Sequence, residues 1–337
     1  MHAESAHTAP PPLFTVLIPT YNRARLLLRA LDSVAAQGWR DFEILLVDDG
    51  STDGSLAAAL RWSRRRDQPL RWLRQAHAGV HAAYNSGVAA ALGELVVVLG
   101  SDDLLLPDSL TRLARAWHAI PSSRRAMYCG IAGHGVHWRS GRLVGDRYPA
   151  AIWDADHLEL KLGRRIGGDK PGAYRRDLLL QHPFPVFAGE PFMRESFVLK
   201  RLALDYRTRY LDEVFQLFDY QQDGLSARVR DLRRRSPRGL RLYFREDANR
   251  YTVAYGMAAR YAAHVRYVRH ALASGAGLRA LWREMRHKGW LLAGLVPGTL
   301  KWLRDCWGLA AQRRADQRPP AQREPAAGDF QRGSSMS

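Results

Sequence analysis

The feature that most constrains the fold of this chain is a regular alternation of short apolar runs with helix-like segments between residues 13 and 118. The runs FTVLIP, FEILLV and ELVVVL begin at Phe14, Phe42 and Glu94, and between them apolar residues recur at helical spacing. The last run has no polar alternation, which is typical of a strand buried on both faces. This order predicts an α/β domain with a mostly parallel sheet flanked by helices.

The expected elements follow directly from these patterns. Between about 128 and 190 the periodicity loosens, and no element is predicted there. The expected strands are Phe14–Pro19, Phe42–Val47, Leu70–Leu73, Glu94–Leu99 and Tyr210–Tyr220, and the expected helices are Arg23–Gln37, Gly54–Arg65, Gly79–Ala91, Leu110–His118 and Phe197–Ala203.

Composition divides the chain into four segments. Residues 1–12 are rich in Ala and Pro and predict a disordered leader, and residues 13–226 hold the α/β domain. Residues 227–310 predict a helical extension. Residues 311–337 are polar, contain Pro and Gly, and predict a disordered tail. Within the extension we expect a basic turn at Leu232–Arg238 and helices at Leu240–Ala273 and Leu278–Arg286.

The positive charge is concentrated in the last third of the chain. The whole sequence carries 51 Lys and Arg against 33 Asp and Glu, a net charge of +18. Residues 226–337 hold 23 of these basic and 8 of these acidic residues, a net charge of +15. Such a segment favours an anionic partner.

Aromatic residues between the arginines narrow the choice of partner. Trp282, Trp290, Trp302 and Trp307 interrupt the basic extension, as in helices that lie on an anionic membrane surface. The alternative is that these helices pack on the α/β domain and expose their arginines. No nucleic-acid-binding motif is present, so nucleic acid is not an expected partner.

The sequence also bears on the compartment. The apolar stretch Gly289–Leu300 is too short to span a bilayer and contains Pro297, and residues 1–12 lack the apolar core of a secretory signal. Cys129 and Cys306 provide no disulfide framework. We therefore expect a cytoplasmic protein that can associate peripherally with the inner face of the cell membrane.

Polar residues follow three of the expected strands, at Thr20–Arg23, Asp48–Ser51 and Ser101–Asp103. In parallel sheets, ligands bind at the carboxyl ends of the strands. The adjacent carboxylates Asp102 and Asp103 suit Mg²⁺ or Mn²⁺, which prefer oxygen ligands, although the same pair could cap the next helix.

The cluster Asp48-Asp49-Gly50-Ser51-Thr52-Asp53 has two interpretations. One of its carboxylates could accept a hydrogen bond from a nucleotide base or ribose, or the cluster could be an ordinary strand-to-helix turn. The chain contains neither the G-x-G-x-x-G fingerprint after the first strand nor a G-x-x-x-x-G-K-[ST] motif. Both absences disfavour a dinucleotide-binding or P-loop domain.

Taken together, the segments FTVLIPTYNR, FEILLVDDGSTDGS, AGVHAAYNSGVAAALGELVVVLGSDD and LPDSL resemble glycosyltransferase family 2. The resemblance covers about residues 13–225 and leaves out the basic extension. It implies a GT-A fold and an inverting, nucleotide-sugar-dependent transferase.

The resemblance also implies roles for individual residues. Asp49 would contact the base, Asp103 would be the direct metal ligand, and Asp102 would contact ribose or a metal-bound water. Many family members have Asp where this chain has Gly100, so Asp102 and Asp103 are the carboxylates left at this motif. The remaining residues expected at the nucleotide sugar are Pro19, Thr20, Tyr21, Asn22 and Asn85.

The resemblance places an acidic catalytic base shortly before Arg201-Leu202-Ala203. The matching residue is Glu195, and Glu190 is the second choice. A carboxylate is needed there to take the proton of the attacking hydroxyl. Taken alone, Glu195 could equally be a carboxylate at a helix N-terminus. The nearby Asp169-Lys170 also resembles family members, without a firm role.

The expected function is an inverting, hexosyltransferase-type transfer of sugar from a nucleotide-diphosphate sugar, with a UDP-sugar favoured. The acceptor would be a hydroxyl group, such as that of a lipid-linked sugar, in bacterial cell-surface polysaccharide or glycolipid synthesis. Two alternatives remain. One is a nucleotidyltransferase, and the other is a non-catalytic sugar-nucleotide-binding scaffold at the membrane, which Gly100 favours.

Overall fold

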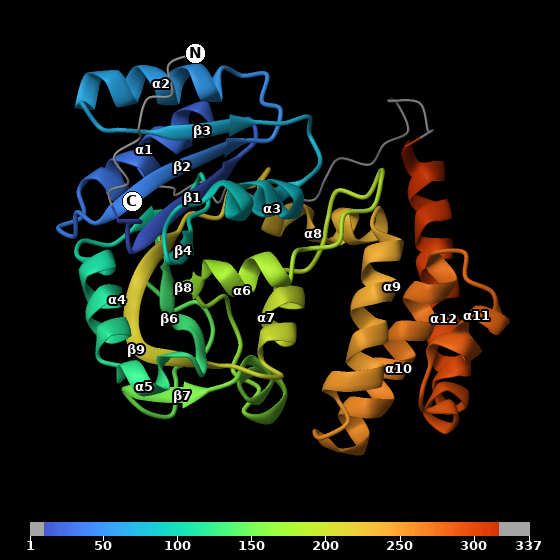
Figure 1. Cartoon of the computed structure of the whole chain (residues 1–337). Helices are drawn as coiled ribbons and strands as arrows, with labels where there is room; N and C mark the ends of the chain where they lie inside the picture. The colour runs from blue at the N-terminus through green and yellow to red at the C-terminus, as the bar shows by residue number, and fades with distance from the viewer. Residues whose placement is uncertain (1–9, 317–337) are drawn as a thin grey trace, which may run out of the picture.

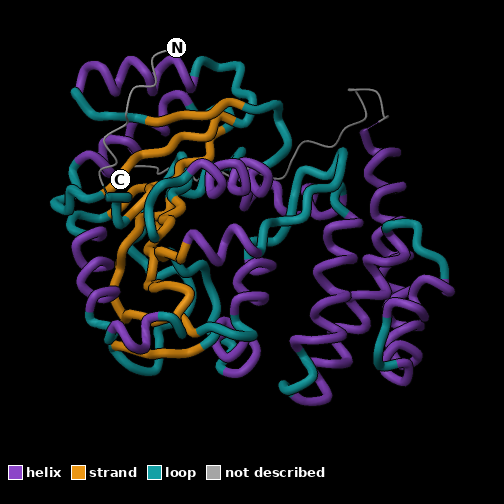
Figure 2. Tube along the Cα trace, in the orientation of Figure 1, coloured by secondary structure: helices purple, strands orange, loops and turns teal. Residues whose placement is uncertain are grey.

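The computed structural model describes residues 10–316 and is built around a nine-stranded sheet (Figure 1, Figure 2). The strand order is β3-β2-β1-β4-β8-β6-β9-β5, and β7 pairs with β9. The first four strands are parallel to one another, as predicted: β1 (Phe14–Thr20), β2 (Phe42–Asp48), β3 (Arg71–Arg74) and β4 (Leu95–Val98).

The second half of the sheet is mixed rather than mostly parallel. β8 is antiparallel to both of its neighbours, and β5 and β7 are antiparallel to β9, whereas β6 and β9 are parallel. The strong apolar runs that predicted a parallel sheet belong to its first half. The strands here are β5 (Leu104–Leu105), β6 (Tyr128–His137), β7 (Ile152–Ala155), β8 (Gly172–Arg175) and β9 (Arg207–Phe218).

Helices cover both faces of the sheet, and β1 contributes to both cores. Val16 and Ile18 pack with Leu27 of α1 on one face, whereas Leu17 packs with Ala83 of α3 on the other. Successive strand residues point to opposite faces, so a fully apolar strand is the expected result. The helices of this part are α1 (Ala24–Ala35), α2 (Ser55–Arg66), α3 (Val80–Ala90), α4 (Ser109–His118), α5 (Ser122–Arg125), α6 (Arg176–Gln181) and α7 (Ser196–Leu202), with a π-helical turn at Glu159–Gly163.

A group of helices follows the sheet, seen at the right of Figure 1. The expected helix over 240–273 is divided, because Gly256 has a φ of +83°, which a continuous helix cannot contain. Most of the basic turn expected at 232–238 is helical, because residues 232–234 end one helix and residues 237–238 begin the next. The helices are α8 (Leu225–Arg234), α9 (Pro237–Glu246), α10 (Gly256–Ala273), α11 (Leu278–Glu284) and α12 (Lys288–Asp316), with a π-helical turn at Asp247–Tyr251.

The expected disordered ends lie largely outside the described residues. Two parts of them fall inside and are ordered. The carbonyl of Pro12 accepts a hydrogen bond from the Glu94 amide at 3.1 Å, and residues 311–316 continue α12. Pro297 lies within α12, and Ala293, whose carbonyl loses its helical partner there, is exposed to solvent. Across the described chain, no helix is long and apolar enough to cross a membrane.

The C-terminal helices are attached to the α/β domain through α9 and the turn after it. Ser196 Oγ lies 2.9 Å from the Tyr243 hydroxyl, and the buried Lys200 ammonium lies 2.5 Å from the Asp247 carboxylate. Arg201 pairs with Glu246 at 2.5 Å. This attachment is the packing alternative that the sequence left open.

Candidate active site

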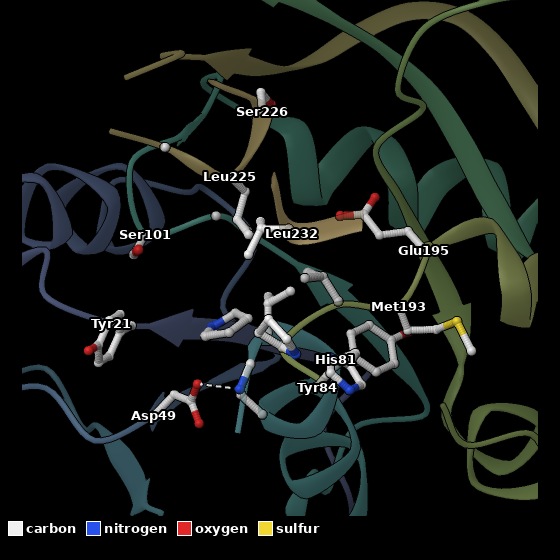
Figure 3. A pocket seen from close by; sticks show the side chains of 18 of the residues that line it. Tyr21, Asp49, His81, Tyr84, Ser101, Met193, Glu195, Leu225, Ser226 and Leu232 are labelled. Carbon is white, nitrogen blue, oxygen red and sulfur yellow. Dashed lines mark hydrogen bonds between the residues drawn. The ribbon is translucent and has the colours of Figure 1, made fainter. Parts of the chain in front are cut away.

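A cavity of about 700 Å³ opens at the carboxyl ends of β1, β2 and β4 (Figure 3). Its other walls come from segments 169–174 and 184–195, from the end of β9 and from α8. All three polar clusters that follow the predicted strands contribute residues to it. The arrangement follows from the parallel order of these strands, whose carboxyl ends meet at one edge of the sheet.

The end of β1 provides an aromatic surface at the cavity. Tyr21 stacks on His77, with ring centroids 3.9 Å apart and planes inclined by 21°. Pro19 and Thr20 also line the cavity. Asn22 does not line it, because its side-chain oxygen accepts a hydrogen bond from the Thr52 amide at 2.8 Å and holds the following turn.

Asp49 is buried at the end of β2 and lines the cavity. Gln75 Nε2 and the Ala78 amide donate to its Oδ1 at 2.7 and 3.0 Å, and the Gly79 amide donates to its Oδ2 at 2.9 Å. His77 Nδ1 lies 2.9 Å from Oδ2 as well. The carboxylate therefore organises the loop before α3, and a contact with a base would share or displace one of these donors.

Asp102 and Asp103 follow β4 and line the same cavity. Gln216 Nε2 and the Asp219 amide donate to Asp103 at 2.9 and 3.1 Å. Burial, together with the neighbouring Asp102 carboxylate, raises the pKa of Asp103 to about 7. Burial likewise raises the pKa of Asp102. This part of the cavity is therefore crowded with negative charge and poorly solvated.

The residues present at this position fit a divalent cation with incomplete protein coordination. A side chain at Gly100 would begin 2.6 Å from Asp103 Oδ2 and 3.1 Å from Asp102 Oδ1, so both carboxylates face the space that Gly100 leaves. Among residues 10–316, no three acidic, His or Cys side chains form a complete metal centre. Mg²⁺ and Mn²⁺ sites of this kind are completed by phosphate oxygens and water.

Glu195 precedes α7 and points into the cavity from the side opposite Tyr21 and Asp49 (Figure 3). Its carboxylate makes no capping hydrogen bond to the helix. Glu195 is itself exposed at the cavity, and the cavity walls surround it. This enclosure, followed by the nearby Asp169 carboxylate, raises the pKa of Glu195 to about 7. An unpaired carboxylate with a raised pKa is suited to accepting a proton.

Glu190 has a different environment, although it also borders the cavity. The amide and Nε of Arg238 donate to its Oε1 at 2.9 and 3.0 Å, and the Gly239 amide donates to its Oε2 at 2.8 Å. The carboxylate thus caps the first turn of α9. The structure assigns Glu190 to holding the C-terminal helices, which disfavours it as the alternative base.

Asn85 lies outside the cavity wall. Its side-chain amide donates to the Phe184 carbonyl at 2.8 Å and accepts from the Phe184 amide at 2.9 Å. Asn85 therefore fixes the segment that leads to Glu190 and Glu195, and the structure gives no support to the expected direct contact with a nucleotide sugar.

Several cavity residues were given no role from the sequence. Lys170 is held by the Asp146 carbonyl at 2.7 Å and by His134 Nδ1 at 3.2 Å. Burial, together with Lys161, lowers the pKa of Lys170 to about 8. His81 is buried, its Nδ1 has no hydrogen-bond partner in the described part of the chain, and burial lowers its pKa. The cations Arg228 and Arg235 come from α8 and the residue after it, so the extension expected from 227 onward contributes to the cavity.

Comparison with known proteins agrees with this geometry. The profile described as "Glycosyl transferase family 2" matches residues 15–159. An uncharacterised glycosyltransferase of Nostoc sp. is 41% identical over 103 residues, which are 31% of this chain and 32% of that protein. A PGL/p-HBAD biosynthesis glycosyltransferase of Mycobacterium bovis is 42% identical over 104 residues, 31% of this chain and 41% of the relative. This chain thus matches less than half the length of these two relatives.

Longer similarities extend beyond that segment. The uncharacterised glycosyltransferase YibD of Escherichia coli is 28% identical over 63% of this chain and 62% of its own length. TarS of S. aureus, solved with UDP-GlcNAc, superposes with a TM-score of 0.56 and 18% identity over 86% of this chain and 78% of that one. A mannosyltransferase of Pyrobaculum calidifontis, solved with GDP-Man and Mn²⁺, superposes with a TM-score of 0.52 and 22% sequence identity, over 88% of this chain and 90% of that one. The fold is similar to that of GT-A glycosyltransferases, and residues 15–159 of this chain match the model of glycosyltransferase family 2.

Proposed function

We propose that this protein is an inverting glycosyltransferase that moves a sugar from a nucleoside-diphosphate sugar to a hydroxyl group. The observation that carries the proposal is the pairing of two features in one cavity. Asp102 and Asp103 form a crowded acidic site at the sheet edge. Glu195 faces the cavity without a hydrogen-bond partner among residues 10–316, and its pKa is raised to about 7. The first feature suits a diphosphate-bound cation, and the second suits a base.

The proposed reaction is a single displacement. The acceptor hydroxyl oxygen forms a bond to the anomeric carbon, and the bond from that carbon to the diphosphate oxygen breaks with its electron pair. Glu195 takes the hydroxyl proton as the new bond forms. Because attack and departure occur on opposite faces of the sugar, the configuration at the anomeric carbon is inverted.

The leaving diphosphate needs positive charge around it. Asp102 and Asp103 would hold Mg²⁺ or Mn²⁺, which would stabilise the developing charge on the diphosphate. The chain itself supplies cations along the cavity: Arg23, Lys170, Arg228 and Arg235. These side chains are placed to bind the phosphates or an anionic acceptor.

The nucleotide is proposed to lie at the ends of β1 and β2. Tyr21 offers an exposed ring, and Asp49 shapes the loop beside it through four close donors. The named ligands of the two structural neighbours are UDP-GlcNAc and GDP-Man, which supports a nucleotide-sugar donor without choosing the base. The mycobacterial relative is named a PGL/p-HBAD biosynthesis glycosyltransferase, which supports sugar transfer without identifying the acceptor.

The test compares two carboxylates five residues apart. Glu195→Gln keeps the size of the side chain and removes its basicity, so transfer is expected to fall by about 10²- to 10⁴-fold while donor binding persists. Donor binding is measured by thermal shift with a panel of UDP-, GDP- and dTDP-sugars, and the same panel identifies the nucleotide base that the site prefers.

Glu190→Gln is the matched control. Loss of a charged acceptor for three donors should lower the free energy of unfolding by about 1–3 kcal/mol and leave the transfer rate of the folded protein largely unchanged. If Glu195→Gln transfers sugar normally, Glu195 is not the base. If no donor in the panel is consumed by the unaltered protein with Mn²⁺ or Mg²⁺ while one binds, the non-catalytic scaffold is the better description.

A further inference from the structure

The outer face of α12 carries a stripe of exposed apolar side chains. Leu292, Val296, Leu300 and Trp307 are 56%, 69%, 60% and 74% exposed. Their spacing of four, four and seven residues places them along one face of the helix. We define these four residues as the α12 stripe. Large side chains gathered at such exposures are uncommon unless they mark an interaction surface.

The stripe lies opposite the face that α12 buries against α10. A Cβ at Gly294 would lie 3.2 Å from the backbone of His264 and Val265, and one at Gly298 would lie 2.6 Å from Val268. These glycines let the two helices approach closely. Arg269 of α10 also pairs with Asp305 of α12 at 2.6 Å. The stripe is therefore fixed in orientation, facing away from α10.

The charged residues around the stripe are almost all basic. Residues 248–307 contain ten Lys and Arg but two acids, Glu284 and Asp305. Glu284 pairs with Arg241 at 2.6 Å, and Asp305 pairs with Arg269. The exposed charges of this region are consequently positive. On α12 itself, Arg304 flanks the stripe, and the exposed Lys301 lies further round the helix.

We propose that the α12 stripe and its flanking cations form a docking surface for an anionic lipid bilayer. Apolar side chains with a Trp would enter the headgroup region, and Arg304 at the edge of the stripe would meet the lipid phosphates. Lys301, further round α12, would add to the positive potential. A second copy of the chain is a poorer occupant, because like charges would face each other across the interface. Residues 317–337 are also a poor cover, since Phe330 and Met336 are their large apolar residues.

The position of α12 supports this orientation. In Figure 1, α9 and α10 lie between α12 and the sheet, so α12 lies on the side of the molecule away from the strands. A membrane bound through the α12 stripe would leave the cavity at the sheet edge unobstructed by the helix that anchors it. The docking surface stands on α10 to α12 alone and is independent of the proposed sugar transfer.

The test is co-sedimentation of the full chain with vesicles, without any activity assay. Vesicles of phosphatidylcholine alone are compared with vesicles of phosphatidylcholine and phosphatidylglycerol in equal parts, from about 0.05 M to about 0.5 M salt. We expect binding to the anionic vesicles that weakens as salt rises. Binding to neither kind of vesicle, or equal and salt-independent binding to both, would overturn the proposal.

Paired variants separate the stripe from the charge. Val296→Gln with Leu300→Gln should weaken binding at least about tenfold by removing apolar insertion, while Leu92→Gln with Met127→Gln, at positions each 51% exposed, should not. Lys301→Glu with Arg304→Glu should weaken binding at least about twentyfold, since each cation at the surface contributes about fivefold. The control for this charge reversal is Arg64→Glu with Arg65→Glu, on the exposed side of α2, which should weaken vesicle binding much less.

Two further measurements decide between occupants. Each variant is first checked for an unaltered circular dichroism melting curve, because the exposed positions should not affect folding. Sedimentation velocity that shows a dimer dissolved by the Val296 and Leu300 changes would assign the stripe to a second copy. Single-stranded RNA that displaces the protein from anionic vesicles and binds the stripe variant undiminished would assign the basic surface to nucleic acid. Either result overturns the bilayer proposal.

Discussion

At the scale of single residues, environment separates carboxylates that the sequence makes look alike. Glu190 and Glu195 lie five residues apart, and both border the cavity. Glu190 accepts three hydrogen bonds from the start of α9, whereas Glu195 makes no cap and has a pKa raised to about 7. A buried, satisfied carboxylate holds structure, and an enclosed but unpaired one is available for proton transfer.

The pH dependence of transfer follows from this environment. A base must be ionised, so we expect kcat/KM for the acceptor to rise with pH through about 7 and then level off. The measurement uses saturating donor and metal, so that ionisation of Asp102 and Asp103 does not limit the rate. A rate that is flat from pH 5 to pH 8 would contradict a base with this pKa.

The free energy of unfolding should change with pH in the direction opposite to the transfer rate. Between the ordinary glutamate value of 4.5 and about 7, the native state binds the Glu195 proton and the unfolded state has lost it. The free energy of unfolding contributed by this group therefore falls as pH rises through that window. Glu195→Gln should accordingly raise the melting temperature more at pH 8 than at pH 5, relative to the unaltered protein.

The acidic site gives a prediction of its own. Asp103→Asn should preserve the fold, because Gln216 can rotate its amide and use its unpartnered Oε1 to accept from the new Nδ2. Transfer should nevertheless fall at least about 10²-fold, since one negative charge that would hold the cation is lost. Turnover and Mn²⁺ dependence equal to those of the unaltered protein would show that Asp103 is not the ligand.

At the scale of elements, the close packing of two loops connects the nucleotide side of the cavity to the base. Gly79 ends the loop organised by Asp49 and has a φ of +93°, and a Cβ there would lie 2.3 Å from the Pro191 carbonyl oxygen. Any side chain at 79 must therefore displace the segment that carries Glu195.

Gly79→Ala should lower both stability and transfer. The backbone at Gly79, with a φ of +93° and a ψ of 159°, alone costs about 1–3 kcal/mol with an alanine, and the displaced 190–195 segment would misplace the base. Gly54→Ala is the matched control, because Gly54 has a φ of +83° and nothing within 4 Å of its Cβ position. We expect both variants to lose stability in urea unfolding, and Gly79→Ala alone to lose kcat. Equal kcat values would show that the two loops are not coupled.

The elements also show what the sequence could and could not predict. Apolar runs identified β1, β2 and β4 because these strands are buried on both faces. β6 was missed because its sequence YCGIAGHGVH alternates with glycine, and these glycines let Phe215 and Phe218 of β9 lie against it. Convergence of Tyr21, Asp49 and Asp103 follows from parallel order, but Arg228 and Lys170 reach the cavity through tertiary packing that leaves no local pattern.

At the scale of the whole molecule, α8 lines the cavity, and α9 with the turn after it is packed against the α/β domain. α8 supplies cavity residues, and Glu190, Lys200 and Arg201 of the α/β domain all pair with residues of α9 or the turn that follows it. The apolar contacts continue through Met193, Phe197, Tyr243 and Phe244, which belong to one core cluster. The sequence boundary at 226 marks a change in composition, but the core crosses it.

A buried ion pair between the α/β domain and the C-terminal helices allows the contribution of this junction to stability to be measured. Lys200 and Asp247 are 5% and 5% exposed and lie 2.5 Å apart, and the Lys200 ammonium lies 4.3 Å from the centre of the Tyr243 ring. Asp247→Asn leaves a buried ammonium without its counter-charge and should lower the free energy of unfolding by about 3–5 kcal/mol. The joint change Lys200→Met with Asp247→Leu removes both charges and should cost much less, because no unpaired charge remains. The control is Asp305→Asn, whose partly exposed pair with Arg269 should contribute less than about 1 kcal/mol.

A single cooperative urea transition that shifts as a whole in Asp247→Asn would show that the helices and the sheet unfold together. Two separated transitions, with the sheet unaffected, would instead make the extension an independent unit, and a fragment ending at 226 would then fold alone.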